Sequence, residues 1–155
     1  MKKIEFYQLA FYLPFNVNFY DEESDYEKHV NTLCKKSIEC FSEKDKLILK
    51  PLIYLTKEIE INGEKFIPIL RLLNLERKEL VIKEIYHDKN YFKSYSVGVK
   101  HHHKNHKDNV CIASLSFGKG NLDVIRFDYA QKLLEWHFDI FDLIDAKLAV
   151  DFYSC

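Results

Sequence analysis

The residues best suited to chemistry lie in one short stretch, SVGVKHHHKNHKDN (residues 96–109). It contains four histidines, which can bind transition metals or transfer protons, and three lysines, which attract anions. Neighbouring residues of an extended chain point to opposite sides, so His101, His102 and His103 cannot all converge on one ion. His101, His103 and His106 could converge, which leaves a metal site open as an alternative. Because the stretch is too polar to bury, we interpret it as an exposed loop.

No spacing elsewhere in the chain matches a catalytic, metal-binding or nucleotide-binding motif. The patterns G-x-S-x-G, H-E-x-x-H and G-x-x-x-x-G-K-[ST] are absent, and GKGN (residues 118–121) is better interpreted as a turn. The four cysteines contain no C-x-x-C pair. Asp139, Asp142 and Asp145 are interpreted as a solvated helix face, and His137 as a partly buried, hydrogen-bonded side chain. We therefore predict a protein that is not an enzyme, with no catalytic residues, no metal ligands and no cofactor.

The composition indicates a globular domain and argues against several classes of protein. The 155 residues are 47% hydrophobic, which suits a packed core and not a disordered chain. The formal net charge is −1, so the large positive excess of a strongly basic nucleic-acid-binding protein is missing. No apolar run is long enough to span a membrane, and the N-terminal residues lack the features of a secretory signal. We therefore expect no membrane association and a cytoplasmic location.

Apolar periodicity predicts helices toward both ends of the chain. Residues 3–13 and 25–42 carry apolar residues at helical spacing. Pro14 ends the first of these helices, because proline has no N–H to continue it. Near the C-terminus, Asp128 with Gln131 three residues later matches an N-cap and its capping partner, so a helix is expected to follow.

The clearest local signal is a hairpin over residues 58–69, EIEINGEKFIPI. Asn62-Gly63 supplies the two positive φ angles of a type I′ turn between two β-compatible runs. Residues 141–152 are expected to form a second short helix and then a brief strand. Further strands are expected over residues 16–20, 46–50, 79–87, 91–99 and 110–117, with a turn or short helix from Pro51 through Leu55.

These elements predict an α+β fold in a single globular domain, residues 1–155. We expect an antiparallel sheet of about five strands, with the N- and C-terminal helices packed on one face. The histidine-rich stretch would then connect two strands as a polar hairpin tip. Exposed basic loops on a rigid sheet are common places for binding residues. We therefore predict a partner-binding surface that comprises Tyr91, Lys93, Lys100, His101, His103, Lys104, His106 and Lys107.

Three segments of the chain resemble a family of small uncharacterised proteins from bacteriophages and prophages. They are LAFYLPF (residues 9–15), PLIYLTKEIEINGEKFIPI (residues 51–69) and KLLEWHFDIFDLIDAKLAVD (residues 132–151). Together they cover less than a third of the chain, and E-W-H-F-D is their most specific string. The family has no assigned catalytic residues, so the resemblance carries none over.

The resemblance implies a phage setting and action by binding. Small prophage proteins with a shared frame and a divergent middle often bind host enzymes, including defence nucleases, and some anti-CRISPR proteins have this size and lack catalytic motifs. We therefore expect an accessory protein in the host cell cytoplasm that binds and inhibits or modulates a host defence factor. The candidate partner is a host protein such as a CRISPR-associated nuclease or its guide-RNA complex.

Two other functions stay open from the residues alone. An accessory protein of phage replication or recombination would bind nucleic acid through the basic loop and the aromatic-rich strands, in a salt-dependent manner. A small metal-dependent protein or enzyme would instead use the histidine-rich loop. Replacing His101, His103 and His106 together with alanine separates this last function from the others.

Overall fold

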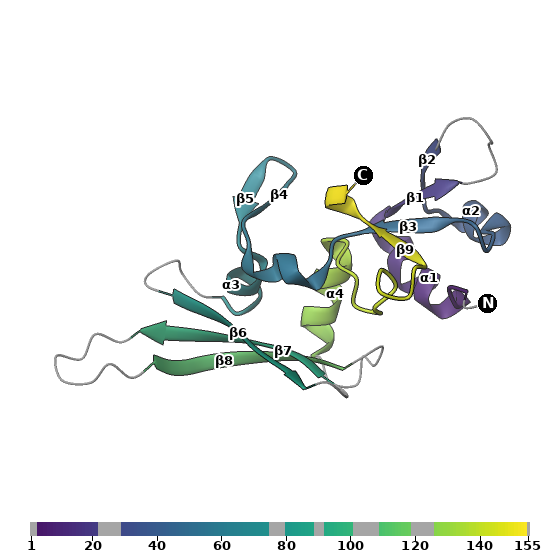
Figure 1. Ribbon diagram of the computed structural model, residues 1–155. Coiled ribbons are helices and arrows are strands. Elements are labelled where there is room, and N and C mark those ends of the chain that lie inside the picture. The colour runs from purple at the N-terminus through teal and green to yellow at the C-terminus, as the bar shows by residue number, and fades with distance from the viewer. Residues whose placement is uncertain are drawn as a thin grey trace, which may run out of the picture. The chain divides into compact units, whose positions relative to one another are not determined.

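The computed structural model divides the chain into two compact units (Figure 1). The terminal unit comprises residues 1–52 and 130–155, and the middle unit comprises residues 53–129. Both helices and strands are present, which confirms the α+β class. The structure describes residues 3–21, 29–74, 80–88, 92–100, 109–118 and 126–154, and within residues 80–118 it describes the backbone alone. The expectation of one globular domain stays a prediction.

A four-stranded sheet in the order β2-β1-β3-β9 forms the centre of the terminal unit. Its strands are β1 (Asn18–Asp21), β2 (His29–Thr32), β3 (Lys46–Leu49) and β9 (Ala149–Asp151). β3 pairs antiparallel with β1 and parallel with β9. Leu47, Ile48 and Leu49 are all buried, so both faces of β3 are covered. The strands expected near residues 16–20 and 46–50 are confirmed.

Helix α1 (Phe6–Tyr12) confirms the expected N-terminal helix. A capping box starts it, in which Glu5 and Gln8 each accept a hydrogen bond from the backbone N–H of the other. A 3-10 helix, η1 (Leu13–Phe15), follows at once. Pro14 lies in η1, where its missing N–H prevents a further α-helical turn.

The core of the terminal unit collects side chains from both of its chain segments. The hydroxyl of Tyr12 in α1 donates to the backbone oxygen of Phe138 at 2.8 Å, across 126 residues of sequence. Phe6 of α1 is nevertheless 70% exposed, so the apolar surface of this helix is covered on one side only. The side chains that are fully covered here include Tyr12, Val17, Leu33, Leu47, Leu49, Leu133, Phe138 and Leu143.

The single helix expected over residues 25–42 is wrong. Residues 22–28 lie outside the described part of the chain, His29–Thr32 form β2, and only Lys35–Cys40 form a helix, α2. β2 pairs with β1 along its whole length, and the hydroxyl of Thr32 donates to Asn18 at 3.1 Å. The apolar spacing that suggested one helix therefore runs across two elements, because strand pairing outweighed the local pattern.

The middle unit contains the expected hairpin, with strands β4 (Ile59–Ile61) and β5 (Glu64–Phe66). Asn62 has a φ of 53° and Gly63 a φ of 81°, which confirms the two positive φ angles of the turn. The 3-10 helix η2 (Leu52–Thr56) precedes the hairpin, as expected after Pro51. Helix α3 (Pro68–Leu72) follows it, with Arg71 of α3 paired to Glu64 of β5.

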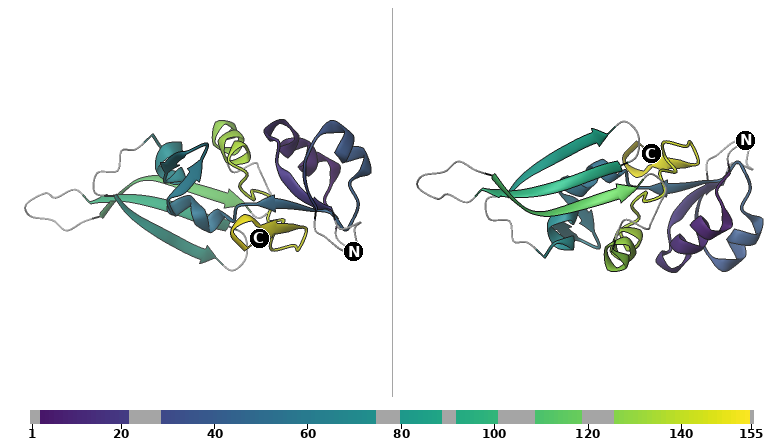
Figure 2. Two further views of the ribbon diagram at one scale, coloured as in Figure 1. Left: turned by 90° about the horizontal axis from the view of Figure 1, so that it is seen from above. Right: turned by 90° about the horizontal axis from the view of Figure 1, so that it is seen from below.

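Three longer strands follow in the middle unit, β6 (Leu80–Asp88), β7 (Phe92–Lys100) and β8 (Asn109–Gly118). They lie side by side as an antiparallel sheet in the order β6-β7-β8 (Figures 1 and 2). The three strands expected here are thus confirmed, but the single antiparallel sheet of about five strands is not. The described strands instead form sheets of four, two and three strands, and one pair, β3 with β9, is parallel. The packing of both terminal helices on one face of a single sheet is therefore not found.

The C-terminal helix α4 (Phe127–Glu135) forms, but it starts before Asp128, so the expected N-cap there is wrong. Asp128 lies in the first turn and pairs with Arg126 at 2.8 Å. The helix expected at the start of residues 141–152 is also wrong. Those residues form turns in which Asp142 and Lys147 have positive φ angles, a conformation that interrupts an α-helix. The brief strand is confirmed as β9, and the 3-10 helix η4 (Phe152–Ser154) follows it.

Candidate functional site

Two of the predicted partner-binding residues lie in described strand backbone. Lys93 pairs with His87 of β6 and Phe117 of β8, and Lys100 pairs with Asn109 of β8. The two lysines are seven positions apart in the sequence, which corresponds to about 23 Å along a strand. Lys93 and Lys100 therefore lie at opposite ends of β7 and do not form one cluster. The other predicted residues lie outside the described part of the chain: Tyr91, His101, His103, Lys104, His106 and Lys107.

The terminal unit buries a lysine, Lys50, immediately after β3. Its side chain is only 6% exposed, and its ammonium donates to the backbone oxygen of Trp136 at 3.1 Å. The same ammonium lies 4.5 Å from the centre of the Phe152 ring. Burial lowers the pKa of Lys50 from 10.5 to about 8, because desolvation disfavours the charged form. A carbonyl and an aromatic ring hold this lysine in place, so we assign it a structural role.

His137 belongs to the same arrangement. The backbone N–H of Lys50 donates to the oxygen of His137 at 2.8 Å, and that of Asp139 donates to the oxygen of Lys50 at 2.9 Å. The ring nitrogen Nε2 of His137 lies 2.8 Å from the backbone oxygen of Phe15. Burial lowers the pKa of His137, while the hydrogen bond to Phe15 acts in the opposite direction. The interpretation of His137 as a partly buried, hydrogen-bonded side chain is confirmed.

Asp139 contradicts the interpretation of three aspartates on a solvated helix face. It is 5% exposed, and its two carboxylate oxygens accept hydrogen bonds from the N–H groups of Leu143 and Ile144, each at 2.8 Å. Burial raises the pKa of Asp139, and these two hydrogen bonds lower it. Hydrogen bonds therefore connect the string E-W-H-F-D to Phe15, to Lys50 and to the turn at Leu143 and Ile144. Its residues support the fold of the terminal unit.

Asp45 is a buried carboxylate of a different kind. Its side chain is 7% exposed, and Oδ2 accepts a hydrogen bond from the backbone N–H of Ser42 at 2.6 Å. Its other oxygen, Oδ1, is buried and has no hydrogen-bond partner among the residues that the structure describes. A buried polar atom without a partner costs about 1–3 kcal/mol, so such an atom often indicates a ligand or a water molecule.

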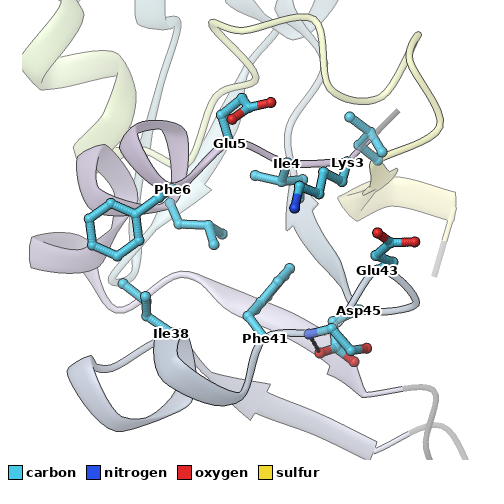
Figure 3. A pocket seen from close by; sticks show the side chains of 11 residues that line it. Lys3, Ile4, Glu5, Phe6, Ile38, Phe41, Glu43 and Asp45 are labelled. Atoms are coloured by element: carbon cyan, nitrogen blue, oxygen red, sulfur yellow. Dashed lines mark hydrogen bonds between the residues drawn. The ribbon is translucent and has the colours of Figure 1, made fainter. Parts of the chain in front are cut away.

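Asp45 lines a pocket of about 280 Å³ in the terminal unit (Figure 3). One wall is the start of α1 with the residues before it, and the other is the end of α2 with the loop to β3. Figure 3 shows the labelled side chains arranged around an open centre, with Ile38 and Phe41 below and Ile4 above. The complete lining is Lys3, Ile4, Glu5, Phe6, Leu9, Ile38, Phe41, Ser42, Glu43, Asp45 and Leu148.

A second cavity of about 370 Å³ also includes Asp45 in its lining, together with two free cysteines, Cys34 and Cys40. Cys34 precedes α2 and accepts a hydrogen bond from the backbone N–H of Ser37. Hydrogen bonds from Ser37 are the main cause that lowers the pKa of the Cys34 thiol. Both thiols are exposed, so they are accessible to reagents in solution.

Comparisons with protein-family models, with curated proteins and with solved structures found no match to this chain. Within the described residues, no set of three or more His, Cys, Asp or Glu side chains is placed to hold a metal ion. No helix in that part of the chain has the length and apolar character needed to cross a membrane.

Asp45 and Lys50 were not identified from the sequence. Lys50 follows an apolar strand, KLIL, where a charged end residue usually reaches solvent. Asp45 had a local signal, because Ser42 and Asp45 have the S-x-x-D spacing in which a side chain caps a nearby N–H. That spacing predicts the bond through Oδ2. No local spacing predicts that Oδ1 lacks a partner among the described residues.

Proposed function

We propose that the chain is a non-enzymatic accessory protein of a bacteriophage or prophage that binds a host defence factor and inhibits or modulates it. The partner that we propose is a CRISPR-associated nuclease, alone or with its guide RNA. The resemblance of three segments to phage and prophage proteins supports the setting, and the middle unit supports action by binding.

The observation that carries this proposal is the register of β7 with β8. Lys100 pairs with Asn109, so these two residues, which flank residues 101–108 in the sequence, lie one inter-strand spacing apart, about 5 Å. This segment contains four histidines, two lysines and one aspartate. Strands of nine and ten residues flank it in the sequence, and binding residues commonly occur on segments next to a rigid scaffold.

The charge of this segment favours an acidic partner surface. Together with Lys100 it carries three lysines against one acidic residue, Asp108. Charge complementarity of this kind mainly raises the association rate and weakens as salt concentration increases. An acidic protein surface and a nucleic-acid backbone both satisfy this requirement, so the experiment must separate them.

The test is a pull-down from lysate of the natural host with the wild-type chain and two triple variants. The first variant carries Lys100→Glu, Lys104→Glu and Lys107→Glu. The control variant carries three charge reversals at exposed lysines of the terminal unit, Lys35→Glu, Lys44→Glu and Lys147→Glu. Bound proteins are identified by mass spectrometry and bound nucleic acid on a gel.

We expect one host nuclease at a stoichiometric level with the wild type and the control, and at least about tenfold less with the first variant. Equal recovery with both variants would place the binding surface elsewhere. Nucleic acid without a protein partner, lost as salt rises, would replace this proposal with a role in replication or recombination. Bound metal that disappears on replacing His101, His103 and His106 with alanine would favour the metal-dependent function instead.

A further inference from the structure

The pocket beside α1 combines an acidic lining with an apolar interior. Three carboxylates line it, from Glu5, Glu43 and Asp45, against one ammonium, from Lys3. The apolar part comes from six side chains: Ile4, Phe6, Leu9, Ile38, Phe41 and Leu148. The formal charge of the lining is therefore −2, next to a surface that can cover a hydrocarbon or aromatic group.

The buried carboxylate of Asp45 gives a separate indication that this pocket binds a ligand. It is more than nine-tenths buried, and Oδ1 has less than 1 Å² exposed to solvent and no hydrogen-bond partner in the described part of the chain. Oδ2 already accepts the N–H of Ser42, which holds the carboxylate in this orientation. A carboxylate oxygen only accepts hydrogen bonds, so the missing partner must be a donor, and a charged donor gives the strongest bond.

We propose that this pocket binds an organic cation, whose ammonium or guanidinium group donates to Oδ1 of Asp45 and whose apolar body packs against Ile38 and Phe41. The volume of about 280 Å³ lies near the lower end for ligand pockets and suits one small molecule or one side chain. Such a cation could be a free amine or an arginine or lysine side chain of another protein. Both sources share the same chemistry at Asp45.

Lys3 is the protein's own competitor for this position. It lines the same pocket and is exposed, and its ammonium has the chemistry that Oδ1 lacks (Figure 3). Lys3 is exposed, so its long side chain can move at small cost when another cation enters the pocket. The proposal therefore predicts opposite effects for changes at Lys3 and at Asp45.

The experiment titrates the full-length chain with 2-phenylethylammonium and follows binding by calorimetry and by backbone amide NMR shifts. The neutral analogue 2-phenylethanol has the same ring and chain length and serves as the matched ligand control. We expect shifts around Ile38 and Phe41 with the ammonium, and at least about tenfold weaker binding of the alcohol. Equal binding of the two compounds, or no binding of the ammonium at millimolar concentration, would overturn the proposal.

Protein variants test the role of each charge. Asp45→Asn should weaken binding by about tenfold or more, and Lys3→Ala should strengthen it. Glu39→Gln, an exposed carboxylate of α2 outside the pocket lining, should leave it unchanged within about twofold. Lys3→Ala and Glu43→Gln change exposed residues, so they decide the question if Asp45→Asn fails to fold. If neither exposed change alters the affinity, the charges of the pocket do not bind the ligand and the proposal is wrong.

A further titration, with a peptide, distinguishes a free amine from a protein side chain as the source of the cation. The capped dipeptide N-acetyl-Phe-Arg-amide is compared with its citrulline counterpart, which keeps the shape but lacks the charge. Tighter binding of the arginine peptide than of 2-phenylethylammonium indicates a protein side chain, and the reverse order indicates a free amine. This outcome is independent of the charge reversals at Lys100, Lys104 and Lys107, so failure here does not affect the proposed function.

Discussion

Two buried charged residues of the terminal unit differ in how their charge is compensated. Lys50 donates to the carbonyl of Trp136 and lies against the ring of Phe152, whereas one oxygen of Asp45 has no donor within the described ranges of the chain. A buried ammonium with neutral partners is destabilised relative to water, which its lowered pKa reflects. The buried ammonium of Lys50 therefore has a structural role, whereas the buried Oδ1 of Asp45 can still accept a hydrogen bond.

The buried ammonium predicts a pH dependence of stability. Folding lowers the pKa of Lys50 from 10.5 to about 8, so between these pH values the unfolded chain binds more protons than the folded one. The free energy of unfolding should therefore rise with pH through this window. We expect wild type to gain on the order of 1–3 kcal/mol relative to Lys50→Met between pH 8 and pH 10.5.

Urea unfolding at a series of pH values measures this difference. Lys35→Met, at an exposed lysine of the same unit, is the control and should follow the wild type. Tyr12, whose pKa burial raises, titrates in all three proteins and cancels in the comparison. A constant difference between wild type and Lys50→Met across the window would show that Lys50 keeps an ordinary pKa.

Individual elements were predictable where the signal is local. Asn62-Gly63 specifies its turn through backbone conformation alone, and alternating residues marked β7 and β8, while β6 was expected without strict alternation. The helices expected over residues 25–42 and at the start of 141–152 failed because strand pairing decides the first region and side-chain hydrogen bonds to the backbone decide the second. β2 forms by pairing with β1, and Asp139 holds the turn at Leu143 and Ile144. Apolar spacing contains no information about such partners.

The turn at Gly63 gives a prediction at the scale of one element. Its φ of 81° is a conformation that a residue with a Cβ adopts at a cost, and no atom lies within 4 Å of where that Cβ would be. Gly63→Ala should therefore lower the free energy of unfolding by about 1 kcal/mol through backbone strain alone. Asn62→Gly is the control, because glycine adopts the positive φ of that position without strain. Chemical denaturation of both variants makes the measurement, and unchanged stability of Gly63→Ala would argue against a type I′ turn.

For the whole molecule, the division into units means that the middle unit is inserted between two segments of the terminal unit. Lys50 and Phe138 form an isolated parallel bridge, and β3 pairs with β9, so residues on both sides of the insertion complete one core. This division could not be predicted, because no linker composition marks the chain near residues 52 or 130. The candidate pocket could not be predicted for a related reason, since its walls come from separate segments.

This arrangement predicts that the terminal unit folds without the middle unit. A shortened chain in which a flexible Gly-Ser linker replaces residues 53–129 should keep Trp136, the single tryptophan, in its buried environment. We expect blue-shifted tryptophan fluorescence and one cooperative thermal transition, with binding to the proposed host partner lost. Emission at the wavelength of a solvent-exposed tryptophan would show that the terminal unit depends on the middle one.

The inserted middle unit also has a consequence for synthesis on the ribosome. Residues 53–129 are contiguous, so this unit can begin to fold as soon as it emerges. β1 and β3 are made earlier, yet β9 and Phe138, which complete their core, follow only after the whole insertion. During translation the nascent chain therefore exposes the apolar β3 for the time needed to add about a hundred residues, on the order of 5–20 seconds. The core of the terminal unit is therefore completed only after the middle unit has been made.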